Sequence, residues 1–425
     1  MSKKILLVLL IPVFLFSTAL GCRDKGTSSA KPITLSVWGV FDSRADLQEI
    51  FNAYKKIRPE VNIDYRAISQ AEYEDLLLDS LAAGEGPDAF IIHNRWTDKF
   101  QNKVTPAPAD KFDLPSFKDT FVSVVAEDMI RDNQILGAPM YVDTLGLYYN
   151  YNHYKRTEKG RPQETWDGFL EDIEILSESY GEDIINSGVA LGTDKSVHQS
   201  VDILLNIFLQ NGVNFYSADG KTVQLSNDKA YNAMEFYTDF SNPESKYYSW
   251  DVDSEQDDLY AFIHGETSTL VGYSYLAEQI AAQARTSGLD FRTEKFPQID
   301  LKNPINFADY WAYTAKKNPK EASRERYAWD LIKFMTSKES EEMYFDKTHR
   351  APSRRDLLDQ YVDDPMYGVF VDQARFAKTI QMYDREKYQE TIEDAIEEVN
   401  EGGLPSQALQ KAAKAIQDLV ALYRK

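Results

Sequence analysis

The sequence predicts an α/β protein built from two domains. Its 425 residues exceed the roughly 250–300 residues at which single hydrophobic cores stop growing. Its composition is 43% hydrophobic, with 22 Phe, 26 Tyr and 6 Trp, which provides enough apolar material for packed cores and excludes wholesale disorder. Short apolar runs alternate with helical periodicity between residues 33 and 92. Such alternation indicates a parallel sheet with helices on its faces.

The first elements follow from apolar spacing and from the residues that end it. In the first helix, Leu47, Ile50 and Tyr54 fall on one face, and Pro59 stops the helix. Asp42 or Ser43 is expected to be its N-cap. The expected elements are, in order, a strand at 33–38, a helix at 44–58, a strand at 61–66, a helix at 70–83 capped by Gly84, and a buried strand at 89–92.

The alternation of strand-like apolar runs and helical periodicity returns after Pro139, and the last third of the chain has a mostly helical pattern. No internal repeat of fixed period is present. The further expected elements are a strand at 145–149, helices at 166–178 and 201–210, a strand at 269–271, and helices at 323–335 and 387–399.

Residues 1–21 read as an export signal. Lys3 and Lys4 precede an apolar run of 12 residues, which is too short to span a bilayer. Cys22 stands where a bacterial lipoprotein signal places its lipidated residue, although Ala19 holds the position that is usually leucine. The alternative is an ordinary secretory signal with an incidental cysteine. Residues 22–31 are expected to be a flexible tether, so that the protein is exported to the periplasm or cell surface and contacts the membrane only through the lipid.

Composition excludes several other classes of function. The formal charge of −21, without a basic stripe, argues against nucleic acid as a partner. A single Cys and five His residues that are scattered along the chain predict no metal site. The chain carries no GxSxG, HExxH or P-loop motif and no GxGxxG after a strand, which predicts neither an enzyme nor a cofactor. A glycosidase, which needs two carboxylates, remains an alternative because 68 acidic residues make such a pair easy to find.

Candidate binding residues follow the ends of the expected strands, because open α/β sheets hold ligands outside the carboxyl ends of their strands. Carboxylates, Asn and Arg can hydrogen-bond to vicinal hydroxyls, and aromatic rings can cover the apolar faces of a sugar. The strand-end rule selects Trp38, Phe41, Asp42, His93, Asn94, Arg95, Trp96, Gly272, Tyr273, Ser274 and Tyr275, of which Trp38, Asp42, Asn94, Arg95, Trp96, Tyr273 and Tyr275 are retained as candidates. Side-chain chemistry and position in the chain add Tyr141, Asp143, Asp309, Tyr310, Trp311 and Arg350. Some have a structural alternative: Trp38 could pack inside its domain, Asp42 could be only a helix cap, and Arg95 could pair with Asp88 or Asp98.

Five stretches, in this order, resemble the bacterial extracellular solute-binding proteins of the carbohydrate-transport type, the group that includes the maltodextrin-binding protein. They are the strand ending at Trp38, residues 82–88 (AAGEGPD) running into 90–92, residues 139–143 (PMYVD) running into 147–150, residues 262–267 (FIHGET) followed by 272–275 (GYSY), and residues 327–334 followed by 351–353 (APS).

The resemblance implies a periplasmic-binding-protein-like fold of two lobes, each a mostly parallel sheet flanked by helices, joined by a hinge that closes over ligand. The implied first lobe is 32–140 plus 292–345, and the second is 141–291 plus 346–425. The resemblance also matches Asp42 and Asp143 to binding carboxylates of the family and places Tyr388 near a stacking aromatic. Ser43 departs from the family pattern, which has lysine there.

The implied function is a monomeric receptor without a cofactor, which captures a mono- or oligosaccharide and presents it to the permease of an ABC importer. A polyamine or short peptide is the alternative ligand class, because acidic groups with aromatic rings also suit an alkylammonium ion. We expect Arg95 to discriminate, since a guanidinium that points into the cleft would disfavour a cation. A sensor or adhesin subunit with the same fold is a third possibility.

Overall fold

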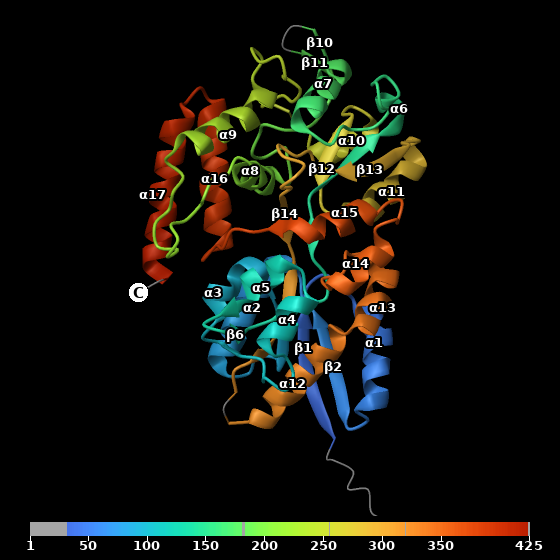
Figure 1. Cartoon of the computed structure of the whole chain (residues 1–425), viewed down its shortest axis with the longest axis vertical. Coiled ribbons are helices and arrows are strands. Elements are labelled where there is room, and N and C mark those ends of the chain that lie inside the picture. Colours follow the sequence, from blue (N-terminus) through green and yellow to red (C-terminus); the bar gives the residue numbers. More distant parts are fainter. Residues whose placement is uncertain (1–31, 181–182, 255, 319, 424–425) are drawn as a thin grey trace, which may run out of the picture.

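The computed structural model describes residues 32–180, 183–254, 256–318 and 320–423. The expected signal peptide, tether and lipidated Cys22 therefore lie outside the described residues. The chain forms two lobes stacked along its longest axis, with β1 and β2 in one and α16 and α17 in the other (Figure 1). Among the helices of the described part, none combines the length and apolar character needed to cross a bilayer.

The first lobe is built on a mixed sheet in the order β2-β1-β3-β15-β4, with β7 also paired to β15. β1 runs parallel to β2 and β3, whereas β15 is antiparallel to β3, β4 and β7. Its strands are β1 (Ile33–Gly39), β2 (Val61–Ala67), β3 (Ala89–His93), β4 (Val104–Thr105), β7 (Ala138–Pro139) and β15 (Trp311–Lys316).

Caps explain where the first two long helices begin and end. Ser43 forms a capping box with Asp46 at the start of α1 (Arg44–Ile57), so Ser43 is the N-cap and Asp42 is not. α2 (Gln70–Ala83) ends at Gly84, whose φ of 79° suits glycine. The other helices of this lobe are α3 (Thr97–Phe100), α4 (Leu114–Thr120), α5 (Ser123–Met129), α12 (Ala322–Met335), α13 (Lys338–Thr348) and α14 (Arg355–Tyr361), with the 3-10 turn η1 (Asn94–Trp96) and the hairpin of β5 (Ile130–Arg131) and β6 (Gln134–Ile135).

The second lobe holds a three-stranded sheet in the order β12-β9-β13, formed by β9 (Gly146–Asn150), β12 (Thr269–Gly272) and β13 (Phe291–Lys295). Both pairings are antiparallel, which differs from the mostly parallel sheet expected here. The reason is that β9 enters the lobe from the hinge and runs away from the first lobe, whereas β12 and β13 run back toward it.

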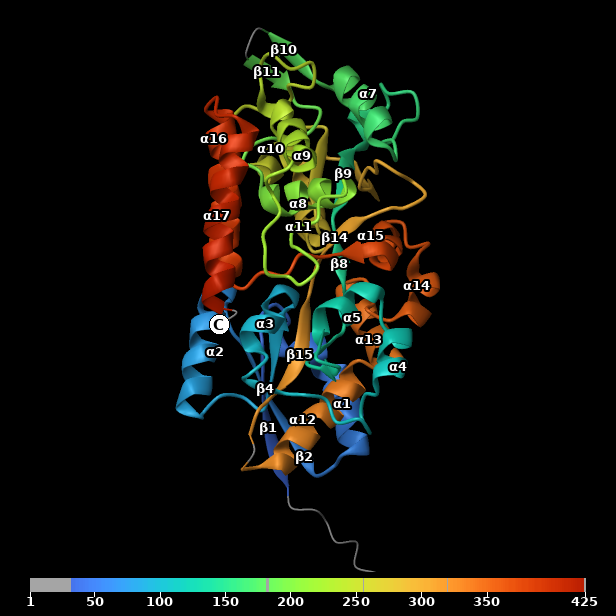
Figure 2. The same cartoon turned by 60° about the vertical axis from the view of Figure 1, so that its left-hand side comes forward.

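Helices make up most of the second lobe. Figure 2 shows α16 and α17 side by side along its flank. The helices are α6 (Tyr151–Tyr154), α7 (Trp166–Leu176), α8 (Ser200–Gln210), α9 (Asp228–Thr238), α10 (Asp258–His264), α11 (Leu276–Ser287), α15 (Gly368–Gln373), α16 (Arg385–Asn400) and α17 (Pro405–Tyr423), with the 3-10 turns η2 (Asp239–Ser241) and η3 (Ala374–Phe376) and the hairpin of β10 (Glu178–Tyr180) and β11 (Asp183–Asn186).

Three short strands cross between the lobes and form a sheet of their own. β14 (Asn306–Asp309) pairs antiparallel with β8 (Asp143–Thr144) and parallel with β16 (Ala377–Lys378). The boundary expected at residue 292 lies inside β13, which pairs with β9 of the second lobe. The chain therefore returns to the first lobe at β14. α14 contacts α4 and α13 of the first lobe, so the last crossing follows α14 instead of residue 345.

Each lobe has its own hydrophobic core. One cluster of buried side chains gathers around the first sheet and includes Trp329 and Phe90, and a second lies between α8, α9, α16 and α17 and includes Phe208 and Tyr388. Each lobe is thus packed around its own core. The surfaces that face each other across the hinge are not needed for these cores and can therefore carry polar side chains.

Candidate ligand cleft

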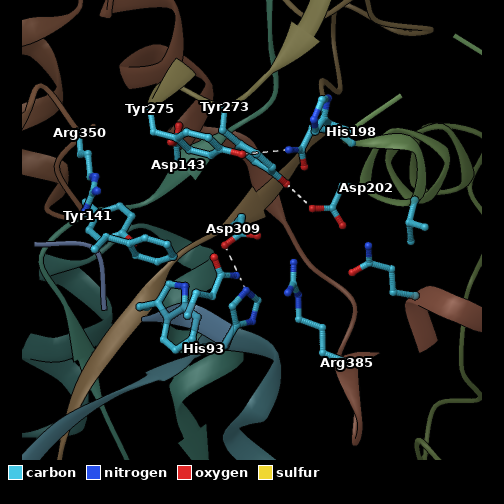
Figure 3. Close-up of a pocket in the computed structure, with 16 residues that line it drawn as sticks. His93, Tyr141, Asp143, His198, Asp202, Tyr273, Tyr275, Asp309, Arg350 and Arg385 are labelled. Carbon is cyan, nitrogen blue, oxygen red and sulfur yellow. Dashed lines mark hydrogen bonds and ion pairs between the residues drawn. The ribbon is translucent and has the colours of Figure 1, made fainter. Parts of the chain in front are cut away.

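A cavity of about 640 Å³ lies between the lobes beside the crossing strands (Figure 3). This volume falls in the range of small-molecule binding sites. The lining side chains come from both lobes and from the hinge. They are Phe41, Gln70, His93, Tyr141, Asp143, His198, Gln199, Val201, Asp202, Tyr273, Tyr275, Asp309, Trp311, Arg350, Arg385 and Gln389.

Trp311 is the centre of the aromatic wall on the first lobe. It is the first residue of β15, directly after the hinge, and pairs in register with His93 at the end of β3. Its ring meets Trp96 edge-on at 4.9 Å between centroids, and Phe41 at 5.7 Å. Trp311 is only 4% exposed, whereas Phe41 is 44% exposed. Trp311 therefore supports the wall, and Phe41 offers the open ring surface.

His93 and Asp309 form a buried pair on the cleft floor. His93 Nε2 lies 3.1 Å from Asp309 Oδ1. Burial lowers the pKa of His93 to about 4, so the imidazole is neutral at neutral pH. Burial alone would raise the pKa of Asp309, but His93 and Arg95 outweigh that effect and lower it. The floor thus presents an ionised carboxylate that already accepts a hydrogen bond.

Arg95 and Asp202 join the lobes through a buried ion pair. Arg95 Nη1 and Nη2 of the first lobe donate to the two oxygens of Asp202 on α8 at 2.9 and 3.0 Å. Tyr273, directly after β12, donates its hydroxyl to Asp202 Oδ2 at 2.7 Å. Arg95 is 2% exposed and does not line the cavity, so its guanidinium does not point at a ligand. The expectation that Arg95 discriminates between a sugar and a cationic ligand is therefore wrong, because its guanidinium does not reach the cleft.

Asp143 is held where β8 leaves the first lobe. Its carboxylate accepts hydrogen bonds from the Ser274 hydroxyl at 2.7 Å, from the Ser274 N–H at 3.1 Å and from the Thr144 N–H at 2.9 Å. Burial raises the pKa of Asp143 to about 6 despite these donors. Asp143 is the first residue of β8 and stands just before β9, so its side chain enters the cleft where these strands begin.

Arg350 forms one side of the cleft together with Tyr141. Its Nη1 donates to Asp42 Oδ1 at 3.0 Å and to the Tyr344 hydroxyl at 2.7 Å. The guanidinium lies 4.9 Å from the centre of the Tyr141 ring, in cation–π geometry. Asp42 therefore acts behind Arg350 as its counter-charge, and burial raises the pKa of Asp42.

The second lobe contributes Tyr275 and the start of α8. Tyr275 is 50% exposed, and its hydroxyl accepts a hydrogen bond from Gln199 Nε2 at 3.0 Å. Nearby, the His198 ring contacts Asp258, the first residue of α10. In the described part of the chain, His198, Asp257 and Asp258 are the one group whose ligand atoms are close enough for a metal ion. Asp257 and Asp258 both accept backbone N–H groups at the positive end of α10, which opposes a cation.

Seven predicted residues line the cavity together, and the others do not. The seven are Tyr141, Asp143, Tyr273, Tyr275, Asp309, Trp311 and Arg350. Trp38 packs within the first lobe under Arg66, and Trp96 stacks on Phe100. The residues outside the cavity lining are Trp38, Asp42, Asn94, Arg95, Trp96, Tyr310 and Tyr388.

The remaining corrections follow from buried hydrogen bonds. Asn94 and Tyr310 both donate to Asp128 Oδ2, at 3.1 and 2.8 Å, and so face the interior of the first lobe. Tyr388 is fully buried in the core of the second lobe, where its hydroxyl lies 2.6 Å from that of Tyr216. Residues one position apart at a strand end point in different directions, which the strand-end rule does not resolve.

Sequence reasoning missed most of the cleft residues that begin helices. Gln70 starts α2, Asp202 lies in the first turn of α8, and Arg385 and Gln389 lie in the first turns of α16. Helices that follow strands begin at the same sheet edge where the strands end, so this pattern was available as a signal. The missed residues are Gln70, His198, Gln199, Val201, Asp202, Arg385 and Gln389. Phe41 and His93 follow expected strands, but they were not retained as ligand-binding candidates.

A family model described as "Bacterial extracellular solute-binding protein" matches residues 39–342, which is more than half of the chain. The chain belongs to this family. Membership in the solute-binding family agrees with the resemblance seen in the sequence.

Solved structures share the fold of this solute-binding protein at low identity. The sugar-binding protein MalE from Xanthomonas citri matches with a TM-score of 0.78 at 16% identity, over 92% of this chain and 98% of its own. The cyclic α-maltosyl-1,6-maltose-binding protein of Arthrobacter globiformis gives 0.75 at 17%, over 92% and 99%. UgpB of Mycobacterium tuberculosis, in complex with glycerophosphocholine, gives 0.74 at 18%, over 93% and 100%. These likenesses show the two-lobed α/β fold.

Proposed function

We propose that this solute-binding protein is an extracytoplasmic receptor that captures a sugar between its lobes and delivers it to an ABC-type importer. The observation that carries the proposal is the combination of aromatic rings and hydrogen-bonding side chains around one cavity. Phe41 and Tyr275 offer exposed rings from opposite lobes, while Asp143, Asp309 and Arg350 offer hydrogen bonds. A sugar presents apolar C–H faces and a ring of hydroxyls, which these two kinds of group match.

Capture would close the lobes about the three crossing strands and exclude water from the cleft. Closure also changes the relative orientation of the outer surfaces, which gives an importer a means to distinguish the loaded receptor. MalE and the cyclic maltosyl-maltose-binding protein, both named for the sugars that they bind, support the choice of ligand class. The proposed receptor binds as a monomer and performs no chemistry on the solute.

The proposal includes an N-terminal lipid anchor at Cys22 after removal of residues 1–21. Its support is the signal-like sequence alone. Intact mass of the protein purified from a lipoprotein-processing host would test it, because a diacylglyceryl-modified Cys22 adds a defined mass that Cys22→Ser lacks. An unmodified mature N-terminus would contradict the anchor and leave a secreted receptor.

The acids of the cleft do not favour a polyamine. Asp202 is paired with Arg95, Asp309 accepts from His93, and Asp143 is occupied by neutral donors. The charge of Asp202 is already compensated by Arg95, and Asp143 and Asp309 already accept hydrogen bonds, so their attraction for a cation is weakened. A sugar hydroxyl needs only one of the acceptor sites that remain on these carboxylates.

Thermal unfolding of the purified protein against mono- and oligosaccharides, polyamines, amino acids and short peptides tests the ligand class. A bound solute raises stability by RT ln(1 + [L]/Kd). We expect a shift with saccharides and a roughly tenfold weaker affinity in Tyr275→Ala, because a well-placed ring contributes about 0.5–1.5 kcal/mol beyond its burial. Tyr275 is half exposed, so the variant keeps its fold.

Tyr180→Ala is the matched control, since Tyr180 is an 81% exposed tyrosine of β10, which is remote from the cleft. The control is expected to leave both affinity and melting temperature unchanged. If only polyamines or peptides raise the melting temperature, the proposal of a sugar ligand is rejected, and the proposal of a solute receptor is retained. Equal loss of affinity in both variants would reject the cleft as the binding site.

A further inference from the structure

Arg385 is the cleft arginine that has no partner. It is the first residue of α16, lines the cavity, and directs its guanidinium toward Asp309 in Figure 3. It forms no ion pair or hydrogen bond with any residue in the described part of the chain, and its Nε is buried without an acceptor. Its field lowers the pKa of Asp309, but the two groups are not in contact.

The other arginines of the cleft region each have an acceptor within the chain. Arg350 donates to Asp42 and to Tyr344, and Arg95 donates to both oxygens of Asp202. His93 is neutral because burial lowers its pKa to about 4. Among the described residues, Arg385 is therefore the one arginine of the cavity lining that has no protein acceptor for any of its five side-chain N–H groups.

Folding does not account for Arg385. A positive side chain in the first turn of a helix opposes the helix dipole and lowers helix stability. Asp384 caps α16 and Lys387 lies 3.5 Å from it, so the local acid is already engaged. A guanidinium kept at an unfavourable position, with a buried and unpaired Nε, points to an acceptor that arrives from outside the chain.

We propose that the solute is a saccharide that carries an anionic substituent, which binds Arg385. The inference rests on the proposed sugar-receptor function and narrows its ligand class. A guanidinium binds a carboxylate, sulfate or phosphate oxygen pair through two parallel hydrogen bonds, which a hydroxyl cannot match. Gln389 lies one turn after Arg385 and also lines the cavity. Its amide nitrogen donates one hydrogen to Glu393 Oε1 at 2.9 Å, and its second hydrogen is a further donor for the same group.

The geometry separates the anionic end of the solute from its stacked ring. Figure 3 shows Arg385 on one side of the cavity and Tyr141 and Tyr275 on the other. A cavity of about 640 Å³ has room for more than one sugar ring between them. The negative group would therefore stand at the α16 end, while the sugar faces rest on the aromatic side.

Isothermal titration of the full protein with disaccharides in matched pairs tests the inference. In each pair, one member carries a uronic acid and the other carries the corresponding neutral hexose, and a sulfated disaccharide forms a separate arm. We expect the uronide to bind at least ten times more tightly than its neutral partner and to weaken as salt is raised. Arg385→Met should remove this preference, and Arg385→Lys should retain part of it.

Lys387→Met is the control, because it removes one positive charge from the same turn while Lys387 does not line the cavity. It should leave the preference intact. A preference for the sulfated member with the same dependence on Arg385 would keep the anionic ligand and identify the ester as its source. If neutral saccharides bind as tightly as uronides, or if Arg385→Met weakens the binding of both members alike, the proposal of an anionic ligand is overturned. The proposal of a sugar receptor is then unaffected. If no saccharide binds at all, the proposed function fails as well.

Discussion

At the scale of single residues, the fold buries a carboxyl group that forms no ion pair with any Lys, Arg or His among the residues that the structure describes. Asp128 on α5 accepts hydrogen bonds from Asn94, Tyr310 and Gln381, at 3.1, 2.8 and 2.8 Å. Burial raises the pKa of Asp128 to about 7. Gln381 belongs to the segment that leaves the hinge for α16, so this carboxyl group ties the last crossing to the first lobe.

The raised pKa of Asp128 predicts the direction of a pH effect on stability. An unfolded Asp loses its proton near pH 4, whereas native Asp128 holds its proton until about pH 7. The native state therefore binds more protons in this window, and the contribution of Asp128 to the free energy of unfolding falls as pH rises. At pH 5 we expect Asp128→Asn to have a lower free energy of unfolding than wild type. The difference between the two should narrow toward pH 7, by about 1.4 kcal/mol per unit of raised pKa. Urea unfolding at pH 5, 6 and 7 measures this.

Asp330→Asn is the control with the opposite shift. Burial by itself would raise the pKa of Asp330, but hydrogen bonds from Arg58 and Lys111 outweigh it and lower this pKa to about 2. Its stabilising contribution is complete above pH 4 and is lost only below that value, so its gap to wild type should stay constant from pH 5 to pH 7. A constant gap for Asp128→Asn as well would show that Asp128 is ionised in the folded protein.

At the scale of secondary structure, strong sequence signals set most element boundaries. The helix expected at 70–83 with a Gly84 cap is observed with those bounds, and the strand expected at 89–92 extends by one residue to His93. The resemblance implied strands that cross between the lobes, but their positions were not predicted, because β8, β14 and β16 have only two to four residues, too few to show a period. The direction of each strand depends on contacts far apart in sequence, so the antiparallel second sheet was also missed.

The same limit explains the mixed outcome for the cleft. A strand end identifies the neighbourhood of the site, which is why Tyr273 and Tyr275 after β12 lie in it. The direction of each side chain depends on partners that the local sequence does not contain. Arg95 faces Asp202 across 107 residues, and Tyr310 faces Asp128 across 182 residues.

Two serine caps offer a test of helix stability within one lobe. Ser43 accepts the Asp46 N–H and takes part in a reciprocal capping box, whereas Ser69 before α2 makes no capping hydrogen bond to the backbone. Ser43→Ala should lower the free energy of unfolding by about 1 kcal/mol, and Ser69→Ala should have a smaller effect. Chemical denaturation of the two variants compares them directly. Equal losses would mean that the capping box contributes nothing beyond the position itself.

At the scale of the whole molecule, the ion pair between Arg95 and Asp202 couples the lobes. Removing Arg95 leaves the buried carboxylate of Asp202 without its counter-ion, which costs about 3–5 kcal/mol, whereas removing Asp202 leaves Arg95 with the more distant carboxylate of Asp309, at 3.7 Å. We therefore expect such a loss for Arg95→Met in urea unfolding and a smaller loss for Asp202→Asn. The double variant Arg95→Met/Asp202→Asn should lose less than the sum of the two single variants, because it removes both charges together.

Small-angle scattering of the same variants, without ligand, separates coupling of the lobes from simple destabilisation. A larger radius of gyration in Arg95→Met than in wild type is the expected result if the ion pair holds the lobes together. Additive losses in the double variant, together with an unchanged radius of gyration, would show that the lobes keep their arrangement without this pair.

The small sheet of β8, β14 and β16 has a mechanical consequence. Three separate linkers would let the lobes twist, slide and bend independently, but strands hydrogen-bonded side by side must deform as one unit. The expected motion is then a rotation about a single axis. One angle would then set both how tightly the lobes enclose a solute and how their outer surfaces are oriented toward the importer that we propose. A solute that only partly fills the cleft would stop that rotation early and present an incompletely turned receptor.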